Sequence, residues 1–299
     1  LGYLGVPIFF VVSGYCIALA ANHSKNVSDF FVRRIFRIFP LYWFSLLVVL
    51  ACVAFTIMNQ GQNSLANIPK SYQNISATLL LLTSPFSSVK TINWVYWSLT
   101  VELFFYVVIA SSLCFSKKIR GYFILFVSVL SCFPQLFQIP GLFFLQQWPS
   151  FGIGLALFGL QMDRSKWLPS FLLLVNSANL LMGEQPSYYP IVSFIAFAII
   201  AISIFLKDIP ANGISKLGDF SYAVYLLHVP IGIYLFGKLK TVTVQSNLIY
   251  NVIYDLTMLA GLIVVSTVVY NYLELPGIKF GKKLAKRLQI KKTFASVQA

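Results

Sequence analysis

The sequence carries very little charge for its length. Only 10% of its 299 residues are Asp, Glu, Lys or Arg, whereas 58% are hydrophobic. In a water-soluble domain roughly a quarter of all residues are charged, because its surface must be hydrated. The shortage excludes an ordinary soluble globular protein, and the mean hydropathy of +0.80 indicates that lipid surrounds most of the chain. We therefore predict an all-α fold, a polytopic bundle of transmembrane helices.

Residues that bind metals or form disulfides are also scarce. The four cysteines, Cys16, Cys52, Cys114 and Cys132, each lie alone in an apolar run. Their spacing indicates neither a disulfide framework nor a metal site, so we predict small buried hydrophobic residues and expect no metal. The net charge of +14 raises the question of a nucleic-acid partner, but the placement of the basic residues favours a lipid surface instead.

The sequence contains nine stretches that are long and apolar enough for a membrane-spanning helix. A helix needs about 20 apolar residues to cross the hydrocarbon core of a bilayer. Two of the nine, 167–183 and 189–206, are short for this purpose. The candidate spans are residues 5–21, 39–58, 94–116, 121–139, 141–161, 167–183, 189–206, 221–239 and 250–273.

The placement of lysine and arginine predicts the orientation of these spans. If the spans alternate, one side of the membrane holds 18 of the 22 basic residues, and the other side holds only Lys70, Lys90, Lys238 and Lys240. Cytoplasmic segments are the basic ones. We therefore predict that the basic tail 277–299 is cytoplasmic, where it lies on anionic headgroups, and that Leu1 is extracytoplasmic.

Only eight residues are acidic, so each can be considered. Two lie inside predicted spans, Glu102 and Asp255, and an ionisable group there marks a functional site by default. For Asp255, near the end of its span, a structural role and a substrate-side role are equally open. The other six fall in solvated loops between the spans, which we call joints, or at the end of the last span. They are Asp29, Asp163, Glu184, Asp208, Asp219 and Glu274.

Glu102 belongs to a polar helix face. Ser98, Glu102 and Tyr106 follow one another at i, i+4 and i+8 and therefore share one side of a helix. A hydroxyl, a carboxylate and a phenol on one face predict a polar cavity. The alternative is a carboxylate that pairs with arginine to fix helix packing. We favour the functional interpretation, because no basic residue on the same helix neutralises Glu102.

Three arginines, Arg33, Arg34 and Arg37, cluster at a predicted helix start in the basic segment between the first two predicted spans. The planar guanidinium group suits bidentate binding of phosphate, whereas lysine supplies only a point charge. Cytoplasmic anchoring explains the cluster equally well, so the residue types alone leave both roles open.

The face of a later span carries Ser221, Tyr225 and His228 at i, i+4 and i+7. A lone histidine in a membrane helix is more often a hydrogen-bonded packing residue than a catalyst. The two hydroxyl groups on its face favour a position in the wall of a cavity.

Taken in order, these motifs resemble the acyltransferase 3 family of membrane O-acyltransferases, which acylate bacterial surface polysaccharides and related molecules. The resemblance covers essentially the whole chain, and the closing Leu273-Glu274-Leu275-Pro276 is also similar to that of the family. The four segments that carry it are Gly5 to Tyr15, Arg33 to Pro40, Trp97 to Leu99 with Glu102 and Tyr106, and Ser221 to His228.

The resemblance implies a single membrane-embedded domain over residues 1–299, with ten helices in the family and about nine here. It implies transfer of an acyl group, taken to be acetyl, from cytoplasmic acyl-CoA to a hydroxyl of a cell-surface or exported glycan. The partners are then acyl-CoA, a glycan and the lipid bilayer, with no nucleic acid. By motif, the catalytic residues are Glu102, His228 and Tyr106, the donor's phosphates bind Arg33, Arg34 and Arg37, and the substrate contacts Trp97, Ser98, Tyr225 and Ser13.

One part of the family pattern has no counterpart in this sequence. The family's first helix carries an arginine and then a histidine that is thought to act as base, and neither His23 nor His228 stands at that place. We therefore expect a chain that is incomplete at its N-terminus.

Two other functions stay open from sequence. A secondary transporter or flippase of a small molecule or lipid-linked sugar also buries charge in a polytopic bundle. An inactive acyltransferase-like protein would fit the missing histidine. All three interpretations place the chain in the bacterial cytoplasmic membrane as a multi-pass protein, and the sequence does not determine its oligomeric state.

Overall fold

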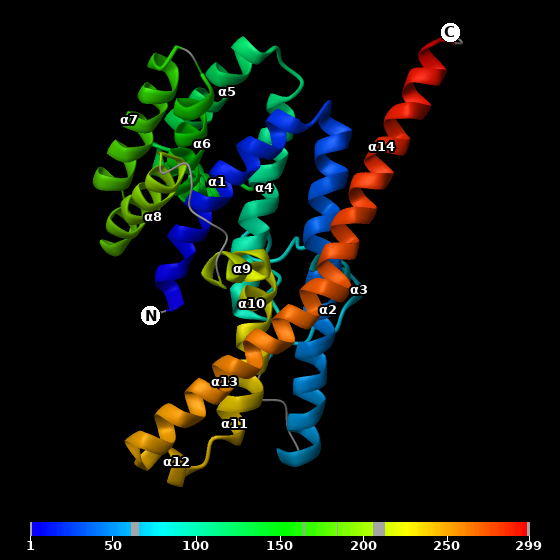
Figure 1. The fold of residues 1–299 in the computed structure, drawn as a ribbon, viewed down its shortest axis with the longest axis vertical. Coiled ribbons are helices and arrows are strands. Elements are labelled where there is room, and N and C mark those ends of the chain that lie inside the picture. Colours follow the sequence, from blue (N-terminus) through cyan, green and yellow to red (C-terminus); the bar gives the residue numbers. More distant parts are fainter. Residues whose placement is uncertain (1, 61–65, 164, 184, 206–212, 298–299) are drawn as a thin grey trace. The chain divides into compact units, whose positions relative to one another are not determined.

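The computed structural model of the chain describes residues 2–60, 66–163, 165–183, 185–205 and 213–297. Within these ranges the chain is helical and forms no strand (Figure 1), which confirms the predicted all-α fold. Several of the helices are long and apolar enough to cross a membrane, so the chain is a multi-pass membrane protein. In the described ranges, five segments reach that length: Gly5–His23, Val27–Asn59, Trp94–Ser112, Ser221–Leu239 and Leu248–Gln289.

The outward surfaces of these helices are strongly apolar. Leu47, Ile191 and Val264 are each more than 60% exposed, which is unfavourable in water but costs nothing against lipid tails. Three of the four cysteines, all but Cys52, are also exposed. The prediction that every cysteine is buried was therefore wrong, because an apolar position in a membrane helix can face lipid instead of the protein interior.

The chain divides into two compact units. The first unit comprises the described residues of Leu1–Phe31, Ser84–Ser88 and Ser98–Ile209. The second comprises those of Val32–Thr83, Val89–Trp97 and Pro210–Ala299. Each unit is therefore assembled from stretches that are far apart in sequence.

The first unit is built around its N-terminal helix. After the turn η1 (Gly2–Leu4), helix α1 packs against α6 and α8, and α6 packs in turn against α7 (Figure 1). The other helices of the unit are α4 and α5, with α5 beside α7. The bounds are Gly5–His23 for α1, Trp97–Ser112 for α4, Lys117–Leu130 for α5, Trp148–Met162 for α6, Trp167–Met182 for α7 and Tyr188–Phe205 for α8.

Two glycines let α1 and α6 touch backbone to backbone. A Cβ atom added to Gly14 would lie 2.1 Å from the carbonyl oxygen of Phe151, and one added to Gly154 would lie 2.1 Å from that of Val11. Such distances are far inside van der Waals contact, so no side chain fits at either position. Small residues at these positions allow the close helix packing that membrane proteins use in place of a hydrophobic driving force.

Two of the predicted spans are interrupted. Helix α5 ends at Leu130, and two 3₁₀ turns, η3 (Pro134–Gln138) and η4 (Phe143–Gln146), precede α6. A continuous helix over 121–139 is therefore the wrong expectation, and the span predicted at 141–161 begins as a helix only at Trp148. Proline accounts for the break, because Pro134 and Pro140 lack the N–H that a helix interior requires.

The second unit is built on the long helix α2 (Val27–Gln60), from Val32 onward, and on two consecutive helices near the C-terminus. Figure 1 shows α13 continuing into α14. The shorter elements of the unit are α3, η2, α9, α10, α11 and α12. Their bounds are Tyr72–Leu79, Trp94–Tyr96, Gly213–Asp219, Ser221–Leu227, Gly237–Leu239 and Val242–Ser246, with α13 at Leu248–Val269 and α14 at Leu275–Val297.

Helix α2 passes through Pro40 without a break. The missing N–H of Pro40 leaves the carbonyl of Phe36 without its usual helical partner. Gly277 of α14 lies against this carbonyl, since a Cβ added there would come within 3.1 Å of the oxygen. One turn later, a Cβ on Gly281 would lie 2.6 Å from the Cβ of Phe36. The first turns of α14 therefore pack on α2 through a Gly-x-x-x-Gly face.

Two segments of the second unit are π-helical, His228–Phe236 and Tyr270–Glu274. A π-helical turn holds an extra residue and is found frequently at functional sites. The first begins at His228 and the second ends at Glu274. Both residues belong to the motifs on which the sequence analysis relied.

Candidate active site

The buried carboxylate Glu102 accepts two hydroxyl hydrogen bonds. Ser13 Oγ of α1 and Tyr106 Oη of α4 both donate to Glu102 Oε1, each at 2.8 Å. Glu102 is 6% exposed, Tyr106 2% and Ser13 6%. A carboxylate that is held away from water needs such donors. The three side chains therefore form one hydrogen-bonded cluster in the first unit.

Tyr106 reaches Glu102 because the two residues are one helical turn apart. Ser13 comes from a helix that is 89 positions away in sequence, and aromatic packing holds that helix in place. The ring of Phe105 on α4 stacks on Phe151 at 4.2 Å and meets Phe10 of α1 edge-on at 5.5 Å. These buried rings fix α1, α4 and α6 relative to one another and keep water from the carboxylate.

Ser98 is fully buried on the same face of α4, one turn before Glu102. The structure thus places all three residues of the predicted polar face in the protein interior rather than toward lipid. Thr100, also fully buried on α4, completes a set of hydroxyl groups around the start of this helix.

His228 is oriented by its own helix. Its Nδ1 lies 2.6 Å from the carbonyl oxygen of Tyr225. A carbonyl only accepts, so Nδ1 carries the hydrogen, and in the neutral ring Nε2 then holds the lone pair. The tautomer follows from this contact. Nε2 is the nitrogen that can take a proton from a hydroxyl group.

Tyr225, whose ring lies 5.8 Å from that of His228, is also hydrogen-bonded to backbone. Tyr225 Oη donates to the carbonyl oxygen of Val95 at 2.8 Å. Val95 lies just before Trp97, the half-buried residue at which α4 begins. Tyr96 forms a 2.8 Å hydrogen bond with Ser45 of α2. These contacts connect three segments of the unit, those of α2, η2 and α10.

The three arginines lie seven to eleven residues into α2, which starts at Val27, earlier than the sequence predicted. Two side chains cap the start of this helix. Asn26 Oδ1 accepts from the N–H of Asp29 at 2.9 Å, and Asp29 Oδ2 accepts from that of Lys25 at 3.0 Å. The cap fixes where the helix starts and so sets the faces on which Arg33, Arg34 and Arg37 project.

Glu274 is a residue whose role the sequence analysis missed. It is 2% exposed, and Arg37 is its electrostatic neighbour within the second unit. Sequence reasoning placed it at the end of a span, because the π-helical turn that carries it inward has no sequence signature. The signal available in the sequence was an acidic residue two positions before a proline, in the family-like ending Leu273-Glu274-Leu275-Pro276.

Asp255 has a simpler environment than Glu102. It is 56% exposed and pairs with Lys240 at 2.6 Å, which is the geometry of a surface ion pair. Of the open alternatives for this residue, the structural one fits better. Glu184 and Asp208 lie outside the described residues.

The predicted site residues therefore fall into two groups, one in each unit. Ser13, Ser98, Glu102 and Tyr106 are in the first, and their burial and hydrogen bonds make it a hydroxyl–carboxylate cluster. The second group contains a histidine in a defined tautomer and the arginines of α2, and consists of Arg33, Arg34, Arg37, Trp97, Tyr225 and His228.

A family model described as an acyltransferase domain matches residues 1–271 of this chain. The chain belongs to the acyltransferase 3 family. It is therefore an acyltransferase, and the match extends over α1, α4 and both groups of site residues. The resemblance stated from the sequence motifs is confirmed.

One curated relative of this acyltransferase comes from Acidianus two-tailed virus. It is named "Putative acetyltransferase ORF330" and is 25% identical over 254 residues, which cover 76% of the chain and 72% of the relative. No solved structure matches the chain.

Proposed function

We propose that this acyltransferase transfers an acetyl group from cytoplasmic acetyl-CoA to a hydroxyl group of a cell-surface or exported glycan. The observation that carries the proposal is the buried Glu102 with its two hydroxyl donors, inside a chain that belongs to an acyltransferase family. The name of the viral relative supports acetyl as the group that is moved.

The transfer forms one bond and breaks another. The acceptor's hydroxyl oxygen attacks the thioester carbonyl carbon, a new C–O bond forms, and the C–S bond breaks. The proton of the hydroxyl passes to a base and ends on the departing CoA thiolate. Because water competes as acceptor, a reaction centre among buried aromatic rings also protects the thioester from hydrolysis.

Two side chains are candidates for the base, one in each unit. Glu102 is a buried carboxylate, and the hydroxyl groups of Ser13 and Tyr106 hold it in place. His228 presents Nε2 as the unprotonated ring nitrogen. General-base catalysis contributes about 10²- to 10⁴-fold to such a reaction, so a conservative substitution at each residue identifies which one acts.

The experiment that tests the function is an assay of the purified protein in lipid nanodiscs with acetyl-CoA and a polysaccharide acceptor. We expect release of free CoA thiol together with a mass increase of one acetyl group per modified hydroxyl. Transport of a labelled sugar across proteoliposomes without thiol release would instead support the transporter alternative.

The arginines give a second prediction. Replacing Arg34 or Arg37 with lysine keeps the positive charge but removes the bidentate fork, so we expect KM for acetyl-CoA to rise about 10-fold or more, with little change in kcat. Lys25→Ala, which removes a charge from the same joint, serves as the matched control and should leave KM within about twofold. An unchanged KM in both arginine variants would exclude donor binding by this cluster.

A third prediction concerns orientation. We propose that the protein lies in the bacterial cytoplasmic membrane with its C-terminus in the cytoplasm, because 18 of its 22 basic residues then lie on the cytoplasmic side. In a variant without native cysteines, a cysteine at Lys286 should react with an impermeant maleimide only after cell lysis. A cysteine at Thr243 should react in intact cells. The reverse pattern would contradict the orientation.

A further inference from the structure

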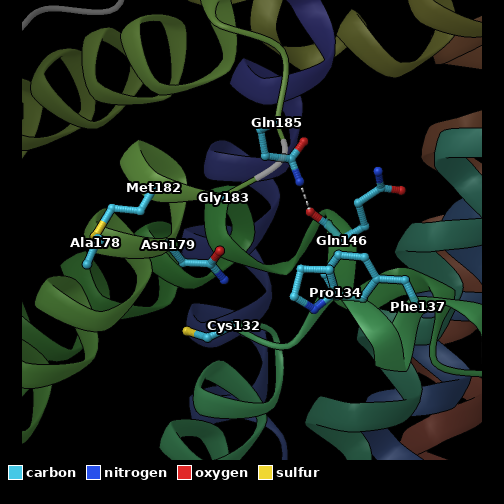
Figure 2. Close-up of a pocket in the computed structure, with 9 residues that line it drawn as sticks. All are labelled: Cys132, Pro134, Phe137, Gln146, Ala178, Asn179, Met182, Gly183 and Gln185. Carbon is cyan, nitrogen blue, oxygen red and sulfur yellow. Dashed lines mark hydrogen bonds between the residues drawn. The ribbon is translucent and has the colours of Figure 1, made fainter.

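A pocket of about 440 Å³ lies in the first unit, where α5 and α7 end. Its size is in the usual range for small-molecule sites. Figure 2 shows the residues that line it, which come from the turns after α5, from η4 and from the end of α7. The lining residues are Cys132, Pro134, Phe137, Gln146, Ala178, Asn179, Met182, Gly183 and Gln185.

The lining combines amide groups with apolar side chains. Gln146, Asn179 and Gln185 each supply an acceptor oxygen and a donor nitrogen, and Phe137 and Met182 supply apolar surface. No Asp, Glu, Lys or Arg is among the lining residues in the part of the chain that the structure describes. A phosphate would call for cations, and a hydrocarbon chain would leave the amides unsatisfied. The chemistry suits a neutral molecule with several hydroxyl groups.

Hydrogen bonds fix two of the amides in position. Asn179 Nδ2 donates to Ser131, at 2.8 Å to the carbonyl oxygen and 3.0 Å to Oγ. Gln185 Nε2 donates to the backbone carbonyl of Gln146, the dashed contact in Figure 2. Gln185 Oε1 is buried, and no donor among the described residues reaches it. A buried acceptor calls for a partner, and a ligand hydroxyl would provide one.

Aromatic packing connects the pocket with the helix that carries Glu102. Gln146 is the last residue of η4, whose Phe143 lies 4.7 Å from the ring of Phe104 and whose Phe144 lies 6.2 Å from that of Phe105. Phe104 and Phe105 lie two and three residues after Glu102, on the same turn of α4. One wall of the pocket is thus packed on the turn of α4 that holds the carboxylate.

The pocket also lies at the ends of α5 and α7 that are remote from the basic joints. Helix α5 starts at Lys117, and α7 follows Lys166, whereas the pocket is formed beyond Leu130 and near Met182. With the basic joints in the cytoplasm, the pocket faces the extracytoplasmic side, where an exported glycan would be modified.

We propose that this pocket binds a neutral sugar unit of the acceptor glycan, adjacent to the unit whose hydroxyl is acylated. The assignment rests on the proposed function, since only a glycan acceptor gives the pocket its role in the reaction. The sugar's hydroxyl groups bind the three amides, and its C–H face packs on Phe137.

The experiment measures sugar binding directly. Methyl glycosides of glucose, galactose and N-acetylglucosamine are added to the protein in nanodiscs, and saturation transfer to their ring protons is recorded by NMR. We expect at least one glycoside to bind, and the affinity to fall about 10-fold in Gln185→Leu and in Gln146→Leu. Gln138→Leu, an exposed glutamine on η3 outside the lining, is the matched control and should bind as the unmodified protein does.

Release of thiol from acetyl-CoA, measured on the same samples, separates the two proposals. Thiol release without glycoside binding, or binding that is equal in all variants, overturns the pocket assignment and leaves the proposed function standing. Gln185-dependent glycoside binding without any thiol release overturns the proposed function and leaves a sugar site. Displacement of the glycoside by inorganic phosphate or by decanoate would overturn the pocket assignment, because it would show a different ligand class.

Discussion

Glu102→Gln should abolish acetyl transfer while the protein still folds and inserts. The amide oxygen of glutamine can accept the hydrogen bonds of Ser13 and Tyr106 that Glu102 Oε1 accepts now, so the packing of α1 on α4 should survive. What is lost is the negative charge and the ability to take a proton. We expect kcat to fall by about 10²- to 10⁴-fold with KM for acetyl-CoA nearly unchanged.

The measurement is the release of CoA thiol by the purified variant, with the acetyl content of the glycan determined by mass spectrometry. Asp163→Asn is the matched control, because Asp163 is exposed beyond the end of α6 and accepts a local backbone hydrogen bond from Ser165 N at 3.1 Å. Its activity should equal that of the unmodified protein. Unmodified kcat in Glu102→Gln would remove Glu102 from the reaction and leave His228 as the candidate base.

Gly14→Leu should have the largest effect on stability. Even a methyl group at position 14 would lie 2.1 Å from the carbonyl oxygen of Phe151, and that oxygen belongs to backbone that cannot rotate away. Overpacking a well-packed core costs about 1–3 kcal/mol, occasionally more. A leucine between two helix backbones belongs at the upper end of that range, so we expect the first unit to lose its packing.

Gly5→Leu is the matched control on the same helix. Nothing lies within 4 Å of a Cβ atom at Gly5, so this variant should behave like the unmodified protein. The fraction that elutes as a monodisperse peak in mild detergent, followed against increasing denaturant, measures the difference. Equal midpoints for both variants would contradict the close α1–α6 contact.

The all-α fold class could be predicted from the composition, and the helices of the strongest apolar stretches from the length of those stretches. The interruption between Leu130 and Trp148 could not be placed in advance, because the segment stays apolar and only Pro134 and Pro140 mark the break. Pro40 shows why proline alone is ambiguous. It lies inside α2 without ending the helix, and Gly277 of a helix distant in sequence packs against the carbonyl of Phe36 that Pro40 leaves without its helical partner.

For the candidate site, helical spacing sufficed for contacts within one helix but not between helices. The spacing of Glu102 and Tyr106 predicts one shared face, and the two do form a hydrogen bond. The contact of Ser13 with Glu102 depends on tertiary packing across 89 positions, which no local pattern encodes. The same holds for Glu274, which is buried at the end of a π-helical segment.

The contact between Gly14 and Gly154 also constrains the order of events during synthesis. The two residues are 140 positions apart in sequence, and a ribosome adds about 5–20 residues per second. Helix α1 therefore spends roughly 7–28 s without its partner helix α6. The first unit is completed later still, because α8 (Tyr188–Phe205), which also packs on α1, follows α6 in the sequence.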